Sequence, residues 1–354
     1  MEINVLEGLL EQLENTDYVP ADVWQRLLSV TDAVSLAFIS SRARDVARAS
    51  FGTGVYVRAL IEISSYCSRG CYYCGLRCAN RTASRYRLTR QQILECCRTA
   101  AERGFNTFVL QGGEDAAMTD EWLAAVVGEI KALYPEKAVT LSVGERSFEG
   151  YTLLRKAGAD RYLLRHETAD DEHYARLHPA SMNGEKRRMR LEWLKSLGFQ
   201  VGAGMMIGSP GQQLHHLVED LLFLDRLKPQ MIGVGPFIPA TGTPFENEPA
   251  GSAELTLLVI SLLRLRFPHA LLPATTALAS LAQHGTLKGI LSGANVVMPN
   301  VTPSEVKGKY TIYNNKKSTG TESLQGLRAL EEELQSIGYH IDYGRGDYKT
   351  DNHV

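Results

Sequence analysis

The sequence predicts an α/β chain folded as a (β/α)8 barrel with an N-terminal helical extension. From Val55 onward, eight short segments with strand character alternate with segments whose apolar residues recur at helical spacing. Several of the expected strands are nearly continuous apolar runs, as strands of a buried parallel sheet are. Eight such units spread over roughly 250 residues match a closed barrel.

The elements follow in a regular order. Residues 1–50 have the amphipathic character of helices, and Pro20 and Asp22 suit a helix start. The expected strands are 55–63, 107–110, 138–143, 161–164, 200–207, 230–234, 271–275 and 294–298. A capping-box pattern at Thr89 and Gln92 predicts the start of the first barrel helix, which continues to Gly104. Further helices are expected at 120–134, 151–157, 185–197, 214–227, 253–266, 279–284 and 323–337.

This order predicts three parts: 1–50 as an N-terminal helical cap, 51–310 as the barrel, and 311–354 as a C-terminal helix and tail that close the barrel. In a (β/α)8 barrel, functional side chains come from the C-terminal ends of the strands and from the loops that follow them. We therefore expect the functional residues at those places.

The composition is typical of a soluble globular protein. The 354 residues carry a formal net charge of -2, and 44% of them are hydrophobic. This charge gives no electrostatic reason to expect nucleic acid or an anionic membrane as partner. The acidic N-terminus lacks the basic and apolar regions of a signal peptide, and no apolar run is long enough to span a bilayer. We therefore expect a cytoplasmic protein.

The cysteines predict a metal site. All six, Cys67, Cys71, Cys74, Cys78, Cys96 and Cys97, lie in one short stretch, whereas a disulfide framework would spread them along the chain. The first three have the spacing C-x3-C-x2-C directly after the first strand. Three thiolates on one loop can ligate three irons of a [4Fe-4S] cubane and leave the fourth iron open. A zinc knuckle that also uses Cys78 is the alternative, and Cys96 and Cys97 are expected to be buried structural residues of the first barrel helix.

At this point the chain resembles the radical SAM superfamily, whose signature is C-x3-C-x2-C after the first strand of such a barrel. Within the biotin-synthase-related branch, it is most similar to the HydE family of [FeFe]-hydrogenase maturases. The resemblance rests on the segments YCGLR (73–77), ASRYRLT (83–89), VLQGGED (109–115), LSVGE (141–145), GADRYLLRHETA (158–169), GAGMMIG (202–208), GPFIPATGTP (235–244), PATTA (273–277) and GANVVMPNVTP (293–303).

The resemblance implies a [4Fe-4S] cluster on Cys67, Cys71 and Cys74, and S-adenosylmethionine (SAM) as the second cofactor. It implies reductive cleavage of SAM to a 5′-deoxyadenosyl radical. That radical would act on an iron–cysteinate carbonyl/cyanide precursor of the hydrogenase diiron cluster. The implied partners are the maturases HydG and HydF and an electron donor.

Polar and glycine residues at successive strand ends complete the candidate site. Two glycines and two acids follow the second strand, and Arg165, which could bind an anionic group, ends the fourth. By resemblance, the residues that bind the cofactors are Tyr73, Gly112, Gly113, Glu114, Ser142, Glu145, Glu167, Arg187, Met206 and Ile207. By resemblance, the substrate pocket consists of Arg165, Thr168, Thr275, Thr276, Met298 and Tyr310.

Each of these assignments has a plain structural alternative. The glycines could serve turns and packing, Arg165 and Glu167 could pair to hold a loop, Arg187 could belong to a solvated charge run, and Met298 could be a core residue. His215 and His216 are expected on the surface of an amphipathic helix, and the role of His166 stays open.

Three functional alternatives also remain. Biotin-synthase-like sulfur insertion needs a second cluster, but the chain has no cysteine after Cys97 and none in 311–326, where some HydE proteins carry a second motif. A methylornithine-synthase-like mutase has a similar barrel without a second cluster. The non-enzymatic alternative is an iron–sulfur scaffold or carrier, which would not need the glycine and carboxylate motifs.

Overall fold

The computed structural model describes residues 1–316 and 324–349. The centre of the fold is a parallel sheet. The predicted first strand is divided at Arg58 into β1 (Gly54–Val57) and β2 (Ala59–Ser64). Among the described residues, β2 continues side by side with β3 (Thr107–Gly112), β4 (Ala138–Ser142), β5 (Arg161–Leu163), β6 (Gln200–Ile207) and β7 (Met231–Pro236). Every pairing in this sheet is parallel.

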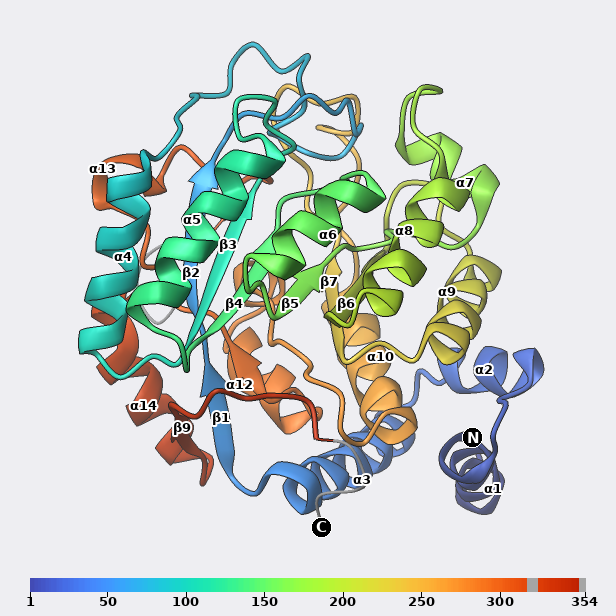
Figure 1. Ribbon diagram of the computed structural model, residues 1–354. Helices are drawn as coiled ribbons and strands as arrows, with labels where there is room; N and C mark the ends of the chain where they lie inside the picture. Colours follow the sequence, from blue (N-terminus) through green and yellow to red (C-terminus); the bar gives the residue numbers. More distant parts are fainter. Residues whose placement is uncertain (317–323, 350–354) are drawn as a thin grey trace.

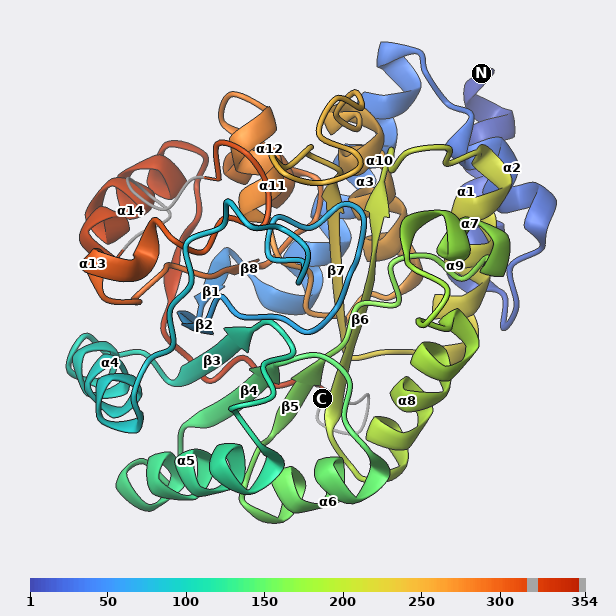
Figure 2. The ribbon, with the colours of Figure 1, turned by 90° about the horizontal axis from the view of Figure 1, so that it is seen from above.

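Shorter backbone contacts complete the ring beyond β7. The N–H of Ile232 donates to Leu271 O at 3.1 Å, and the N–H of Ala274 donates to Val296 O at 2.9 Å. Val296 belongs to β8 (Val296–Val297), which pairs with β1. Beyond it, the N–H of Val301 donates to Leu60 O in β2 at 2.8 Å. The strands therefore form a closed barrel, and the predicted fold class is confirmed (Figure 2).

Helices surround this ring (Figures 1 and 2). They are α4 (Arg90–Glu102), α5 (Asp120–Leu133), α6 (Phe148–Lys156), α7 (Asp171–Leu177), α8 (Gly184–Ser196), α9 (Leu214–Leu227), α10 (Ala253–Arg266), α11 (Thr276–Leu281), α12 (Gly285–Leu291) and α13 (Ser304–Lys307). Their apolar faces pack on the sheet, as α4 does with Ile93, Cys97 and Ala100. The capping box predicted at Thr89 and Gln92 is present.

The N-terminal helices and the last described segment, which ends at residue 349, lie near the N-terminal ends of the strands. Helices α1 (Ile3–Asn15), α2 (Ala21–Leu28) and α3 (Ala33–Phe51) pack against α9, α10 and α12, opposite the loops at the top of Figure 1. The C-terminal segment contains η2 (Leu324–Gly326), α14 (Leu327–Ser336) and β9 (His340–Asp342), which pairs with β1. Beyond β9, the fully buried Arg161 donates to Arg345 O at 2.8 Å and to Asp347 at 2.7 Å. The division into three parts stays a prediction.

Two expected elements differ in the structure. The expected strand 271–275 is reduced to isolated contacts, because Pro273 has no N–H to donate and Thr275 already caps α11. The expected helix 279–284 is replaced by α11 and α12, which meet at His284. Helix α7 and strand β9 were not expected. Part of the predicted C-terminal segment, residues 317–323 and 350–354, lies outside the described residues. None of the described helices combines the length and apolar character that crossing a bilayer requires.

Candidate active site

The cysteine loop follows β2 at the C-terminal end of the barrel. It is hydrogen-bonded to three segments that are distant in sequence, each at 2.9 Å: Ser68 N–H donates to Glu114 O, Tyr72 N–H to Leu177 O, and Gly75 N–H to Ile312 O. The Arg85 side chain donates to four carbonyl oxygens of the same loop. The loop is therefore ordered by the protein itself.

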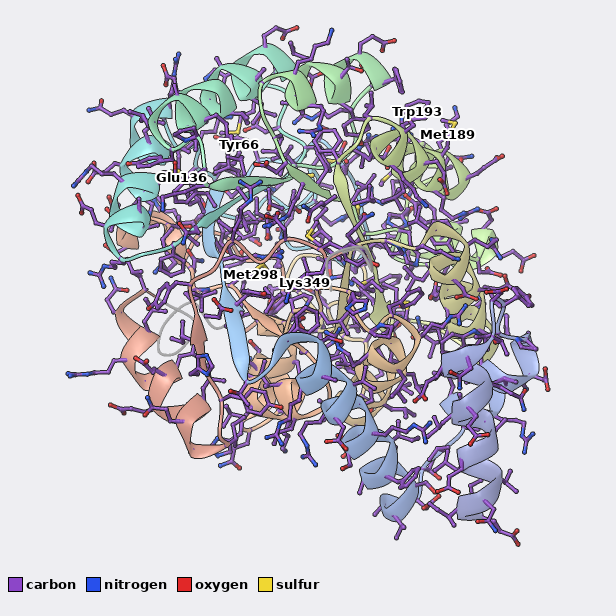
Figure 3. All side chains as sticks on the ribbon, turned by 60° about the horizontal axis from the view of Figure 1, so that its bottom comes forward. Tyr66, Glu136, Met189, Trp193, Met298 and Lys349 are labelled. Atoms are coloured by element: carbon purple, nitrogen blue, oxygen red, sulfur yellow. The ribbon has the colours of Figure 1, made fainter. Side chains whose placement is uncertain are left out.

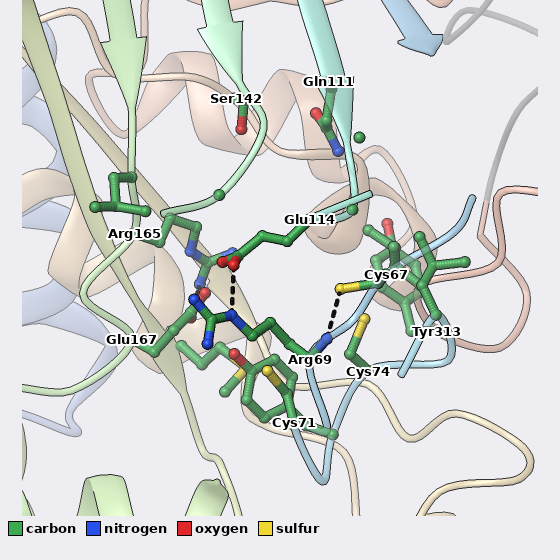
Figure 4. A pocket seen from close by; sticks show the side chains of 18 of the residues that line it. Cys67, Arg69, Cys71, Cys74, Gln111, Glu114, Ser142, Arg165, Glu167 and Tyr313 are labelled. Carbon is green, nitrogen blue, oxygen red and sulfur yellow. Dashed lines mark hydrogen bonds and ion pairs between the residues drawn. The ribbon is translucent and has the colours of Figure 1, made fainter. Parts of the chain in front are cut away.

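Three of the cysteines face one cavity. Cys67, Cys71 and Cys74 line a pocket of about 260 Å³, whereas Cys78 is exposed and lies outside its lining. Figure 4 shows Cys67, Cys71 and Cys74 on the loop beside Arg69. Cys96 and Cys97 are buried on α4, as predicted.

The chemistry of the three thiols suits metal ligation better than nucleophilic catalysis. Burial raises the pKa of all three, that of Cys74 to about 12, so the free thiols carry their protons. A bound metal ion would displace those protons. Among the described residues, one group of three His, Cys, Asp or Glu side chains has its ligand atoms all within 4.8 Å of one another, and this group contains no cysteine. The sulfurs of Cys67, Cys71 and Cys74 are therefore not all within 4.8 Å of one another. A tetrahedral zinc site needs sulfurs about 3.8 Å apart, so the wider spacing fits a cubane and disfavours the zinc knuckle.

Glycines let the strand ends approach the cysteine loop closely. A Cβ on Gly113 would lie 2.2 Å from the backbone oxygen of Tyr66 and 2.6 Å from Cys67 Cβ. A Cβ on Gly112 would lie 3.2 Å from Ile63 Cγ1. The turn itself is fixed by Asp115, which accepts from Ser64 Oγ at 2.6 Å and pairs with Arg87. The glycines of this motif are thus required by packing around the cysteine loop.

A charged network forms one wall of the pocket. Arg69 pairs with Glu114 (Figure 4) and, at 3.4 Å, with Glu145. Arg187 on α8 pairs with Glu145 at 2.9 Å and donates from Nε to Arg165 O at 2.6 Å. Although burial opposes its charge, the surrounding acids and tyrosines hold the pKa of Arg187 above its usual range. The wall thus presents fixed charges of both signs, which suit a zwitterionic ligand.

Glu167 has a strained backbone at the end of β5. Its φ is 69°, in the left-handed region that non-glycine residues rarely adopt. Backbone bonds hold it there, since its N–H donates to Gly204 O at 3.0 Å and its C=O accepts from Met206 N–H at 3.4 Å. Its Oε2 forms an ion pair with Arg165 Nη2 at 3.3 Å, without hydrogen-bond geometry. Strain of this kind occurs at ligand sites, and Glu167 lines the pocket together with Arg165.

Most of the predicted site residues come together in this pocket. Its lining includes Cys67, Cys71, Cys74, Tyr73, Gly112, Gly113, Glu114, Ser142, Arg165, Glu167, Arg187, Met206 and Tyr310. Glu145 lies beside it through its ion pairs with Arg69 and Arg187. The roles assigned to these residues stay predictions.

The other predicted residues lie outside the lining. Ile207 and Thr168 are fully buried, Thr275 caps α11, and Thr276 is the first residue of that helix. Met298 packs on a cluster of Met231, Leu271 and Val296. Figure 3, which looks toward the lower end of the barrel, places Met298 at that end. The contacts of Met298 therefore fit the alternative that it is a core residue.

Several lining residues were not predicted. Arg69 lies within the cysteine motif, and its charge at that position was an available signal. Met182 follows the unexpected helix α7 and places its sulfur 3.9 Å from Cys71 Sγ. Ile312 and Tyr313 come from the segment after the last strand. No local pattern indicated these three, because their place depends on how distant loops meet.

The histidines require one correction. His215 is exposed as expected, but His216 is buried, because its ring stacks on His173 with 4.4 Å between centroids. Asp170, His215 and His216 are the close group noted above. His216 Nδ1 accepts the Gln213 N–H at 2.8 Å, and Asp170 accepts the His173 N–H at 2.7 Å. These bonds cap the N-termini of α9 and α7, which accounts for the group without a metal.

Comparisons with known proteins agree with this geometry. Residues 61–224 match the model of the radical SAM superfamily. The [FeFe] hydrogenase maturase subunit HydE of Thermotoga maritima is 42% identical, with 87% of each chain covered. The 3-methylornithine synthase of Methanosarcina barkeri is 31% identical, over 92% of this chain and 90% of that one. The crystal structure of methylornithine synthase (PylB) superposes with a TM-score of 0.82 at 26% identity, covering 94% of this chain and 96% of that one. The chain therefore belongs to the radical SAM superfamily and is an enzyme of that type.

Proposed function

We propose that this radical SAM enzyme takes part in maturation of the [FeFe]-hydrogenase active site and acts on an iron–cysteinate carbonyl/cyanide precursor. The observation that carries the proposal is the 42% identity to a HydE maturase over 87% of both chains. HydG as the source of the precursor and HydF as a further partner are part of the same proposal.

The family implies a [4Fe-4S] cluster and SAM, and the residues present fit both. Cys67, Cys71 and Cys74 would hold the cluster, because their thiols face one cavity and Cys78 does not join them. When bound, the cluster supplies the electron that cleaves SAM to the 5′-deoxyadenosyl radical.

The protein's own contribution is to bind and orient SAM. The Arg187 guanidinium is suited to the carboxylate of SAM, since it lies in the pocket and is held by Glu145. Glu114 is suited to the amino group, because its carboxylate faces the same wall. The Glu167 carboxylate lines the pocket and can accept from a ribose hydroxyl. Binding of the SAM amino group to Glu114 would replace the Arg69–Glu114 ion pair.

The inner part of the pocket is suited to a polar substrate with anionic groups. Arg165, Gln111 and Tyr310 line it, and Gln111 Nε2 donates to the Tyr310 hydroxyl at 3.4 Å. Glu62, fully buried deeper in the barrel, is neutralised by its ion pair with Lys316. Arg165 pairs with Glu167 at 3.3 Å and keeps 31% of its side chain exposed, so it is suited to contact cyanide or carboxylate groups of a substrate. The closed barrel keeps water away from the reacting atoms.

A methylornithine-synthase-like mutase is the second candidate. The 31% identity over 92% of this chain to the 3-methylornithine synthase of Methanosarcina barkeri supports it. A diamino acid carries two ammonium groups, and each would need a carboxylate or carbonyl partner in the pocket. The substrate that stimulates SAM cleavage therefore distinguishes the two candidates.

The test has two stages. Anaerobically reconstituted protein is reduced with dithionite in the presence of SAM, and 5′-deoxyadenosine is quantified. The wild type should produce it, Cys71→Ala should not, and Cys78→Ala should behave as the wild type. The iron–cysteinate complex and a set of diamino acids are then compared as stimulants of 5′-deoxyadenosine formation. Stimulation by a diamino acid alone would replace the maturase proposal with the mutase. A wild type that binds a cluster without cleaving SAM would favour the carrier.

A further inference from the structure

The chain after β5 has two pocket residues on either side of a buried histidine. Arg165 and Glu167 line the pocket (Figure 4), whereas His166 between them is fully buried and lies outside the lining. The Glu167 backbone has the left-handed φ of 69° described above. A residue other than glycine keeps this conformation only where the surrounding structure holds it. The contacts around Glu167 therefore decide where its carboxylate lies.

The His166 side chain makes one of these contacts. Between the last β5–β6 pair and the isolated bridge at Glu167, residues 164–166 lie opposite residues 203–204, so the regular ladder is interrupted. There the N–H of Gly204 donates to His166 Nδ1 at 3.3 Å, and the Gly204 carbonyl accepts the Glu167 N–H at 3.0 Å. His166 thus acts as the acceptor in place of a backbone carbonyl. Because Nδ1 accepts, the proton of the neutral ring lies on Nε2.

The other edge of the His166 ring faces helix α9. Nε2 lies 3.4 Å from Asp220 Oδ1 without hydrogen-bond geometry, and neither side chain is exposed. The ring meets that of Phe223 edge to face, with 4.9 Å between centroids. The same Asp220 oxygen accepts the N–H of Ala169 at 2.5 Å. Helix α9 therefore contacts the chain at residues 166 and 169, on both sides of Glu167.

This polar pair is costly to bury. His166 Nε2 and Asp220 Oδ2 are both buried without a hydrogen-bond partner. An apolar pair could fill the same space without that cost. It could not, however, accept the N–H groups of Gly204 and Ala169. The function of the pair is therefore to hold the backbone around Glu167.

We propose that His166, together with Asp220, is a positioning residue that fixes the Glu167 carboxylate in the pocket and thereby sets the affinity for SAM. The inference rests on the proposed function, in which Glu167 accepts a hydrogen bond from SAM. His166 contacts no bound molecule itself and acts through the backbone of β6 and through α9. Without its bond to Gly204, the Glu167 backbone is free to leave the left-handed region, which moves the carboxylate away from SAM.

The test is the dissociation constant of SAM for the reconstituted protein, measured by anaerobic equilibrium dialysis without reductant or substrate. His166→Leu keeps an apolar side chain against Phe223 but has no acceptor. We expect it to bind SAM about 10-fold more weakly, as the loss of one hydrogen bond at a precisely placed group allows. His166→Asn has an oxygen as many bonds from Cα as Nδ1 is. It can accept the Gly204 N–H and should bind SAM within about threefold of the wild type.

A double-variant cycle separates this role from a general loss of stability. Glu167→Ala removes the carboxylate that His166 is proposed to position. Adding His166→Leu to it should weaken SAM binding by less than about twofold further, since the two residues act as one unit. His173→Leu is the matched control. His173 is another buried histidine, which bonds to Ser209 at 2.9 Å outside the pocket lining, so its loss should leave SAM affinity unchanged.

Each outcome decides a different point. An unchanged affinity in His166→Leu, or a loss of the same size in the Glu167→Ala background, overturns the inference. If His166→Leu does not fold, Asp220→Ala decides in its place, because it removes the acceptor of the Ala169 N–H; wild-type affinity in that variant would overturn the inference. A failure of the proposed function looks different. A wild type that binds no SAM, or a Glu167→Ala variant with wild-type affinity, would overturn the role assigned to Glu167 itself. Because no substrate is present, the choice between the iron–cysteinate complex and a diamino acid does not affect the result.

Discussion

Replacing Gly113 by alanine should damage the site by geometry alone, with no loss of a functional group. The new Cβ would lie 2.2 Å from Tyr66 O and 2.6 Å from Cys67 Cβ. Both neighbours are close to the backbone, so neither can turn away as a long side chain could. Relief requires the end of β3 and the start of the cysteine loop to separate by about 1 Å, since non-bonded carbon atoms sit about 3.5 Å apart.

Such a displacement has two expected consequences. Overpacking of this kind costs about 1–3 kcal/mol of stability. A shift of about 1 Å between groups that must act together can reduce turnover about 100-fold. We therefore expect Gly113→Ala to lower 5′-deoxyadenosine formation about 100-fold, with a smaller loss in the free energy of unfolding.

Gly128→Ala is the matched control. Gly128 lies within α5, and a Cβ there would meet no atom within 4 Å. Alanine in an open helical position stabilises by about 0.8–1 kcal/mol relative to glycine. Both variants are compared by anaerobic SAM-cleavage assays and by urea unfolding of the apoprotein. If Gly113→Ala turned over SAM within about twofold of the wild type, the close approach of the two segments would not be needed and the reasoning would be refuted.

Three further predictions follow from the same contacts. Arg187→Lys should weaken SAM binding about 10-fold to 100-fold, because a lysine cannot bridge Glu145 and a ligand carboxylate; Arg188→Lys, whose pair with Asp171 lies on the outside of α8, should change it less than twofold, as calorimetry can measure. Cys78→Ser should retain the iron content of the wild type after reconstitution, whereas the zinc-knuckle alternative expects a loss of bound metal. Burial lowers the pKa of His173 to about 4 and that of His178 to about 3. Below pH 6.5 the unfolded chain therefore binds more protons than the folded chain does. The free energy of unfolding of the apoprotein should fall by up to about 1.4 kcal/mol per pH unit for each histidine between pH 6.5 and 4. Urea unfolding at pH 6.5 and pH 4.5 checks this, and His178→Gln should show about half of the decrease.

The sequence was most informative where the local pattern and the tertiary environment agree. The expected strand 200–207 and the helices 214–227 and 253–266 have the expected bounds, because each is a long apolar or amphipathic segment between clear turns. The expected strand 271–275 failed because its residues had other partners. Pro273 cannot donate, and Thr275 is the cap of a helix that the sequence pattern placed three residues later.

The site shows the same division. Motif residues that end a strand reach the pocket because barrel topology alone brings strand ends together, as with Glu114 and Arg165. Thr168 follows the strained Glu167, and its side chain is buried in the wall, without exposure to the pocket. Sequence periodicity cannot show this, because the positive φ at Glu167 changes the alternation of side chains beyond the strand end. Met182 and His178 depend on α7, whose seven residues are too few to show a helical period.

The contacts of the cysteine loop also bear on how a cluster enters the protein. In a zinc finger the metal organises the loop, and the apoprotein is unfolded. Here Glu114, Leu177 and Ile312 supply backbone acceptors, and Arg85 binds four carbonyl oxygens. These bonds involve no thiol, so they do not compete with metal binding at the cysteines. The apoprotein should therefore accept a cluster into a folded barrel, and cluster assembly should leave the unfolding cooperativity of the chain unchanged. Because the loop is already ordered, cluster and SAM binding lose little free energy in ordering it, and more of the binding energy remains for positioning the two cofactors.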